Sequence, residues 1–298
     1  TIDEGGYFDI TTLDAGNEVR RETILTLEEL GIDVEYSHHE TAPSQHEIDL
    51  RYTDGMTMAD IVMVYRMVVK EIAQLKGVYA SFMPKPIFGV NGSSMHTHQS
   101  IFKGDKNLFF DPADKYHLSR EAKAYIAGIL EHSKEITLVC NQWVNSYKRL
   151  VPGYEAPVYI CWARRNRSSL VRVPMYQPGK EKSTRIEFRS PDPACNPYLA
   201  FACMVAAGMK GINDKYPLRE PLERDVYHLS LDEIKELKIE CLPGSLIEAI
   251  EVAESSKLLK DVLGPHVFNN LIMSKRIEWD EYRKQVHDYE LKTYLPLL

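Results

Sequence analysis

A stretch with the sequence STRIEFRSPDP constrains the fold more than any other segment, because charged and apolar residues alternate along it. Arg185, Glu187 and Arg189 alternate with Ile186 and Phe188. A β-strand sends successive side chains to opposite faces, so the apolar pair is predicted to enter a core while two guanidiniums and a carboxylate share the other side. An isolated run of this kind is usually a solvated sheet face with cross-strand ion pairs. Complementary residues elsewhere in the chain favour a phosphate-transfer site built around divalent metal instead.

The composition restricts the classes of protein to which the chain can belong. Its 298 residues suffice for one large domain or two modest ones, and its net charge of -7 argues against a nucleic-acid-binding surface. No apolar run reaches the length of a membrane span, and nothing resembles a signal peptide. The five cysteines lack CxxC spacing, which is typical of reduced thiols. We therefore expect a cytoplasmic protein with no membrane or nucleic-acid partner.

Short strand-like runs are mixed with helical segments and show no regular βαβ alternation. This arrangement predicts one α+β domain in which helices surround an antiparallel β-sheet. Hydrophobic periodicity and capping residues predict helices over 18–30, 57–76, 119–141 and 198–212, and a strand over 78–83. The last of these helices is rich in Ala and Gly, which permits a close approach of another backbone.

Carboxylates and histidines occur where strand-like runs end. Glu40 and Glu47 lie near the ends of two consecutive runs, and His96 and His98 have the spacing that places both imidazoles on one face of a strand. Several carboxylates with one histidine suit Mg²⁺ or Mn²⁺, and zinc is the second choice because no cysteine lies nearby. Each pair alone is more often a structural histidine or an exposed acid, but together they indicate a metal site.

Positive charges are dense in one part of this acidic chain. They are Arg165, Arg167, Arg172, Lys182, Arg185 and Arg189. Guanidinium groups bind carboxylate and phosphate oxygens bidentately, so this density indicates an anionic ligand. Surface ion pairing remains the alternative for Arg165 and Lys182.

The loop 145–157 contains Arg149, Glu155 and a Pro-Gly pair, and it could close over a site. An irregular connection without function is the alternative. Neither GxxxxGK[ST] nor GxGxxG is present, so a nucleotide would be held by metal and arginine.

Longer blocks of the sequence resemble a known family. The blocks GGYFD, HHETAPSQHEID, NGSSMHTHQS, NSYKRLVPGYEAP, RNRSSLVRVP and STRIEFRSPDPACNPYLAFA resemble the signature blocks of type I glutamine synthetase, in the family's order and from Gly5 nearly to the C-terminus. The resemblance implies the family's catalytic-domain fold, an antiparallel sheet with surrounding helices of the guanido-kinase-like kind. It also implies ATP-dependent ligation of ammonia to L-glutamate through γ-glutamyl phosphate, which yields glutamine, ADP and phosphate.

The same resemblance implies a role for each matching residue. The metal ligands, Mg²⁺ or Mn²⁺ with two or more ions per site, would be Glu40, Glu47, His96 and Glu187. Glutamate would be held by Asn91, Gly92, His96, Arg149, Glu155 and Arg189. ATP would be bound by Glu35, Tyr52, His98, Ser100, Arg167, Arg172, Lys182 and Arg185. Glu155, as a flap carboxylate, and Arg167 would be catalytic.

The chain also departs from the family pattern. Ser94 replaces a glycine that is usual in the NGSGMH block, and Tyr227 lacks the sequence context of the adenylylation site found in some relatives. The N-terminal β-grasp domain and the first metal-ligand strand would precede Thr1, so residues 1–298 are expected to be the catalytic domain alone, with little activity by themselves.

Further expectations concern partners and alternatives. The family forms homo-oligomers of two stacked hexamers, a dodecamer with active sites between subunits. Two alternatives stay open: a γ-glutamyl ligase for another amine such as a polyamine, and a non-catalytic structural or regulatory relative.

Overall fold

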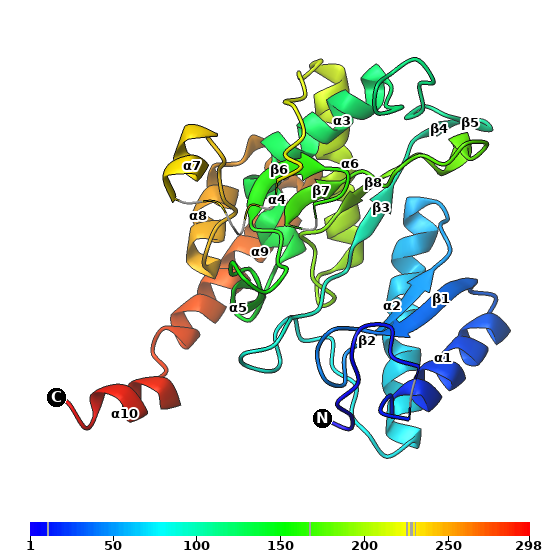
Figure 1. Cartoon of the computed structure of the whole chain (residues 1–298). Coiled ribbons are helices and arrows are strands. Elements are labelled where there is room, and N and C mark those ends of the chain that lie inside the picture. The colour runs from blue at the N-terminus through cyan, green and yellow to red at the C-terminus, as the bar shows by residue number, and fades with distance from the viewer. Residues whose placement is uncertain (11, 167, 225, 227–228, 230) are drawn as a thin grey trace.

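A computed structural model describes the chain from residue 1 to 298 apart from 11, 167, 225, 227, 228 and 230 (Figure 1). Its helices are α1 (Asn17–Glu29), α2 (Gly55–Leu75), α3 (Arg120–Glu131), α4 (Ser133–Cys140), α5 (Ser146–Arg149), η1 (Glu181–Ser183), α6 (Pro197–Asn213), α7 (Leu231–Glu236), α8 (Leu246–Ser255), α9 (Lys257–Tyr282) and α10 (Asp288–Tyr294). Its strands are β1 (Val34–His39), β2 (His46–Leu50), β3 (Thr97–Gln99), β4 (Phe102–Lys103), β5 (Lys106–Asn107), β6 (Tyr159–Ala163), β7 (Ser169–Arg172) and β8 (Ile186–Phe188). The α+β class expected from the sequence is confirmed.

A four-stranded sheet in the order β3-β8-β7-β6 forms the centre of the molecule. β8 pairs antiparallel with both β3 and β7, and His98 lies opposite Glu187. β6 and β7 run parallel, so the expectation of a purely antiparallel sheet is wrong for this pair. Side-chain alternation has a period of two in either pairing, so the sequence pattern could not distinguish the two directions.

The main core fills the space between this sheet and the helices that cover it. Ile186 and Phe188 of β8 are 0% and 1% exposed and pack there with residues of α3, α4, α6, α8 and α9. The alternation of β8 is therefore confirmed. Its polar residues Glu187 and Arg189 are also buried, so they form a polar layer and not a solvated face.

A smaller lobe is built from α1, the antiparallel β1-β2 hairpin and α2, as Figure 1 shows in blue. Its own small core consists of Leu27, Ile32 and Val68. α2 begins two residues earlier than the sequence pattern indicates, because the Asp54 side chain accepts hydrogen bonds from the main chain of Met56 and Thr57. Residues 78–83 follow α2 as irregular chain, so the strand predicted there is wrong.

Helices α3 and α6 touch through their backbones. A Cβ atom placed on Gly211 would lie 2.1 Å from the Ala124 carbonyl oxygen, and one on Gly128 would lie 2.2 Å from the Ala207 carbonyl oxygen. The close approach expected for the Ala- and Gly-rich helix is confirmed. This contact packs the two helices tightly against each other.

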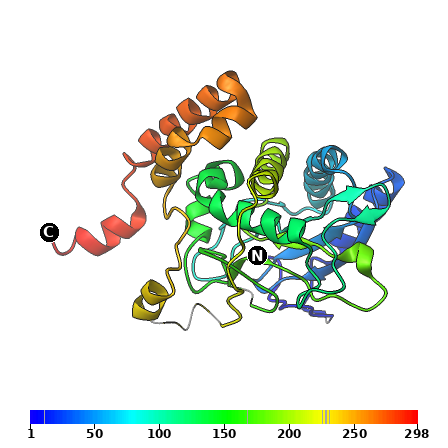
Figure 2. The same ribbon diagram turned by 90° about the horizontal axis from the view of Figure 1, so that it is seen from above.

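The C-terminal part is helical, as expected. α9 contains a break at Gly264, and α10 projects away from the body in both views (Figures 1 and 2). Among the residues that the structure describes, no helix combines the length and the apolar character needed to cross a membrane.

Candidate functional site

A cleft of about 890 Å³ lies between the small lobe and the edge of the central sheet. Glu40 and Glu47 reach it from the β1-β2 hairpin. His96 reaches it from the position just before β3, and Glu187 reaches it from β8. The four residues assigned to metal by the resemblance thus line a common cavity although they span almost 150 positions of the sequence.

Glu40 and Glu47 form a compact group with His38. Nε2 of His38 lies 3.1 Å from Oε1 of Glu40 and 3.8 Å from Oε2 of Glu47. One possible ligand atom from each of the three residues lies within 4.8 Å of the other two. Burial, together with the adjacent Glu40 carboxylate, raises the pKa of Glu47 to about 9. Two carboxylates held this close favour either a shared proton or a cation.

Glu187 forms the second polar group, at the edge of the central sheet. Its side chain is 2% exposed and accepts hydrogen bonds from Arg172 Nε and, at 2.7 Å, from Arg189 Nη1. Nδ1 of His96 lies 3.4 Å away. Burial by itself would raise the pKa of Glu187, but His96 in its protonated form and the guanidinium groups of Arg189 and Arg172 outweigh it and lower the pKa to about 2. The carboxylate is therefore charged at neutral pH.

His96 lies beside Glu187 and lines the same cleft as Glu40 and Glu47. Burial, with a smaller contribution from the charge of Arg189, holds the pKa of His96 well below its ordinary value. A neutral imidazole has a free lone pair, which is the form that binds metal. The four residues assigned to metal are therefore three carboxylates and one neutral imidazole, and this set suits Mg²⁺ or Mn²⁺.

Arg149 is buried at the end of α5 beneath the cleft. Its guanidinium donates to the carbonyl oxygens of Arg189 at 3.0 Å and Ser190 at 2.7 Å. It also donates to Ser94 Oγ at 2.6 Å. The serine that replaces the usual glycine therefore contacts an arginine assigned to glutamate, a contact that a glycine could not make.

The remaining assigned residues divide into two sets. The cleft is also lined by Tyr52, Asn91, Gly92, His98, Arg149, Glu155, Arg172 and Arg189. Four others, Glu35, Ser100, Lys182 and Arg185, do not line it. Arg185 nevertheless borders the site, because its Nε donates to Nδ1 of His98 at 3.0 Å. Arg167 and Tyr227 lie outside the described residues.

The loop after α5 carries Glu155 to the mouth of the cleft. Two residues of this loop have left-handed backbone, Gly153 with φ of +93° and Glu155 with φ of +54°. Lys85 Nζ lies 3.9 Å from the centre of the Tyr154 ring, which ties the loop to the irregular segment between α2 and β3. These features suit a segment that covers bound ligands.

Two residues of the site were missed in the sequence. His38 lies two positions before Glu40 in a strand, and this spacing alone could have placed it on the same side. Gln45 donates from Nε2 to the carbonyl oxygen of Gly92 and to Ser93 Oγ, both at 3.0 Å, and so links the hairpin to the segment before β3. No local pattern marks such a long-range contact.

Comparison with known proteins gives a consistent result. Residues 1–294 match the family model described as "Glutamine synthetase, catalytic domain". The glutamine synthetases of Methanosarcina mazei and Mycolicibacterium smegmatis are each 54% identical to the chain, over 296 and 295 residues. Each of these alignments covers 99% of the chain and 66% of the relative. The chain therefore spans just under two thirds of the length of these curated relatives.

A solved structure described as "GmaS/ADP complex-Conformation 1" has the same fold. It superposes with a TM-score of 0.88 at 33% sequence identity, covering 97% of this chain and 66% of that one.

Proposed function

Because the chain belongs to the glutamine synthetase catalytic-domain family, we propose that its protein joins ammonia to L-glutamate with cleavage of ATP to ADP and phosphate. The observation that carries the proposal is the shared cleft of Glu40, Glu47, His96 and Glu187 in a chain of this family. In this reaction the γ-carboxylate of glutamate attacks the γ-phosphate, and ammonia then displaces phosphate from γ-glutamyl phosphate.

Divalent cations fit the residues that face the cleft. Glu40 and Glu47, with His38 beside them, would hold one cation, and His96 with Glu187 would take part in holding a second. The high pKa of Glu47 supports this, because burial beside the Glu40 carboxylate disfavours the charged form of Glu47 until a cation neutralises the pair. Mg²⁺ or Mn²⁺, when bound, would neutralise negative charge on the phosphates.

Other residues of the chain would bind and shield the substrates. Arg172 and Arg189 place guanidinium groups at the same cavity as the acidic residues, where phosphate and carboxylate oxygens can accept their hydrogen bonds. Glu155 on its covering loop would exclude water from the acyl phosphate and take a proton from ammonium. The ADP named with the structural neighbour supports a nucleotide in this cleft.

Assembly and location remain proposals as well. The exposed apolar side chains of the projecting α10, which include Leu291 and Tyr294, support homo-oligomer formation. A dodecamer and a cytoplasmic location remain predictions.

The experiment that tests the function is an assay of phosphate release by the full-length protein with ATP, glutamate and ammonia, with glutamine measured in parallel. We expect glutamine and phosphate in equal amounts. A polyamine or another amine preferred over ammonia would identify the related γ-glutamyl ligase, and no phosphate release with any amine would favour the non-catalytic relative. The 298-residue chain assayed alongside tests the prediction that it catalyses little alone.

The pKa of Glu47 leads to a prediction for metal binding. Below about pH 9 this carboxyl keeps a proton when no cation is bound, whereas a cation binds the carboxylate. Binding of Mn²⁺ near neutral pH should therefore release a proton, and the apparent affinity should rise as the pH approaches about 9. Calorimetric titration in buffers of different ionisation enthalpy measures the number of protons released.

Glu47→Gln serves as the control, because an amide has no proton to lose in this range. Mn²⁺ binding to the unsubstituted protein without proton release would show that Glu47 is already ionised.

A further inference from the structure

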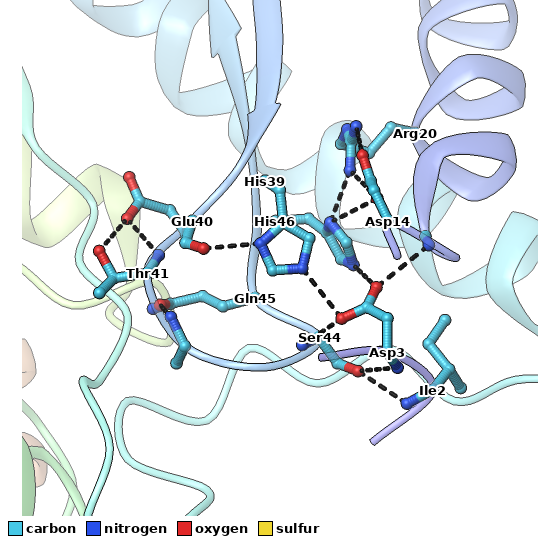
Figure 3. A network of polar contacts seen from close by, with 12 residues as sticks. Ile2, Asp3, Asp14, Arg20, His39, Glu40, Thr41, Ser44, Gln45 and His46 are labelled. Carbon is cyan, nitrogen blue, oxygen red and sulfur yellow. Dashed lines mark hydrogen bonds and ion pairs between the residues drawn. The ribbon is translucent and has the colours of Figure 1, made fainter. Parts of the chain in front are cut away.

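Asp3 comes from the irregular N-terminal segment and is buried beneath the metal-binding hairpin (Figure 3). Its side chain is 1% exposed. Oδ1 accepts hydrogen bonds from the main-chain nitrogen of Ser44 at 2.7 Å and lies 2.9 Å from Nε2 of His39. Oδ2 accepts from the main-chain nitrogen of Gly16 at 3.3 Å. A buried carboxylate with this many partners is held in one position.

His39 transmits this position to Glu40. Its ring is fully buried, and its second nitrogen, Nδ1, lies 2.6 Å from the carbonyl oxygen of Glu40. A carboxylate and a carbonyl can only accept hydrogen bonds, so both ring nitrogens of His39 donate. Asp3, His39 and the main chain of Glu40 therefore form one continuous chain of hydrogen bonds.

Ser44 and Gln45 fix the other end of the same turn. Ser44 has φ of +56°, and its Oγ accepts from the main-chain nitrogens of Ile2 at 2.7 Å and Asp3 at 3.1 Å. The main-chain nitrogen of Glu40 donates to the carbonyl oxygen of Gln45 at 2.7 Å. Both ends of the turn that carries Glu40 into the cleft are thus bound to the segment around Asp3.

The acids and histidines here could also be taken for a further metal site, since ligand atoms of Asp3, Asp14, His39 and His46 lie within 4.8 Å of one another. Arg20 argues against that interpretation. Its guanidinium pairs with Asp14 at 2.6 Å and donates to Nδ1 of His46 at 2.7 Å.

The hydrogen bond from Arg20 places the remaining ring proton of a neutral His46 on Nε2, 3.6 Å from Asp3 Oδ2. A metal ion would have to displace that proton beside an arginine. Because Arg20 already pairs with Asp14 and His46, we interpret the group as a support for the hairpin and not as a metal site.

We propose that Asp3 is a positioning residue for the cation-binding pair Glu40 and Glu47, acting through His39 and the main chain of the turn. This inference rests on the proposed function, because it assumes that the pair binds a divalent cation. Residues that orient metal ligands typically change metal affinity about 10- to 100-fold when they are removed. Asp3 is not among the residues that line the cleft, so the expected effect is on cation affinity.

The test measures Mn²⁺ binding to the full-length protein by electron paramagnetic resonance of the free ion, well below the melting temperature of every variant. Asp3→Ala should weaken binding about tenfold or more. Asp3→Asn keeps an oxygen for Ser44 and His39, so it should weaken binding less and melt closer to the unsubstituted protein.

Asp114→Ala provides a matched control. Like Asp3, Asp114 fixes a turn through main-chain hydrogen bonds, because it accepts from the main-chain nitrogens of Tyr116 and Leu118. It also pairs with the ammonium group of Lys123. It lies outside the lining of the cleft. This variant should melt at a lower temperature and bind Mn²⁺ with unchanged affinity.

Unchanged Mn²⁺ affinity in Asp3→Ala, with a lowered melting temperature, would overturn the inference and leave the proposed function intact. Equal weakening in Asp3→Ala and Asp114→Ala would also overturn it, because the effect would then follow stability. If the unsubstituted protein binds no Mn²⁺, the metal site itself fails and the inference fails with it.

Discussion

Glu187→Ala is expected to reduce phosphate release in the full-length protein by about three orders of magnitude, because loss of the carboxylate that we propose holds a metal ion would remove several kcal/mol of charge stabilisation. It should also lower the free energy of unfolding by about 3 kcal/mol, since Arg189 is left buried without its carboxylate partner. Phosphate release and denaturant unfolding of the same preparation measure the two effects.

The stability effect should depend on pH in a defined direction. Burial opposes ionisation of Glu187, but His96 in its protonated form and the charges of Arg189 and Arg172 lower its pKa to about 2. Because the pKa of Glu187 is lower in the folded state than in the unfolded state, its charge stabilises the fold at any pH above the unfolded-state pKa of about 4.3. This contribution is lost as the pH falls toward 2. The difference between Glu187→Ala and the unsubstituted protein should therefore be constant near neutral pH and shrink in acid.

Glu187→Gln separates the two roles of this residue. The amide oxygen can still accept a hydrogen bond from an arginine, but it carries no charge for a cation. We expect this variant to be more stable than Glu187→Ala and similarly inactive. Phosphate release at the unsubstituted rate in either variant would reject Glu187 as a metal ligand.

Gly211→Ala is expected to lower the free energy of unfolding by about 3 kcal/mol, near the upper end for overpacking. The added Cβ would lie 2.1 Å from the Ala124 carbonyl oxygen and 2.7 Å from the main chain of Gly128. Both neighbours are backbone atoms of α3, which cannot rotate away as a side chain can. Urea unfolding followed by circular dichroism measures the change.

Gly55→Ala is the control for this prediction. Gly55 begins α2, and a Cβ atom there would meet nothing within 4 Å. In a helix, alanine is better than glycine by about 0.5–1 kcal/mol, so Gly55→Ala should be neutral or slightly stabilising. Equal stability of the two variants would mean that α3 and α6 can separate at little cost in free energy.

Local patterns predicted much of the fold. The helix predicted over 198–212 agrees with α6 to within one residue at each end, because the Asn196 side chain that caps α6 acts within three residues of itself. The strand predicted over 78–83 was wrong. Residues 78–82 line the cleft instead, and within the described part of the chain no strand pairs with them. His132 divides the predicted 119–141 helix into α3 and α4, which the periodicity did not indicate.

The site was predicted less completely than the fold. Glu40 and Glu187 could be proposed as metal ligands because they are carboxylates within sequence blocks that resemble those of the family. The contact between Gln45 and Gly92 and the one between Asp3 and His39 join segments 47 and 36 positions apart, and no local pattern encodes them.

The amino-acid sequence by itself determined which residues alternate, which helices begin where, and which side chains can hold a cation or a phosphate, because these properties depend on neighbours a few positions away. Only the tertiary structure decided that Glu187 is a buried charge between two arginines, that β6 and β7 run parallel, and that Asp3 supports Glu40. These features depend on distances between segments remote in the chain, which the packing of the small lobe against the sheet sets.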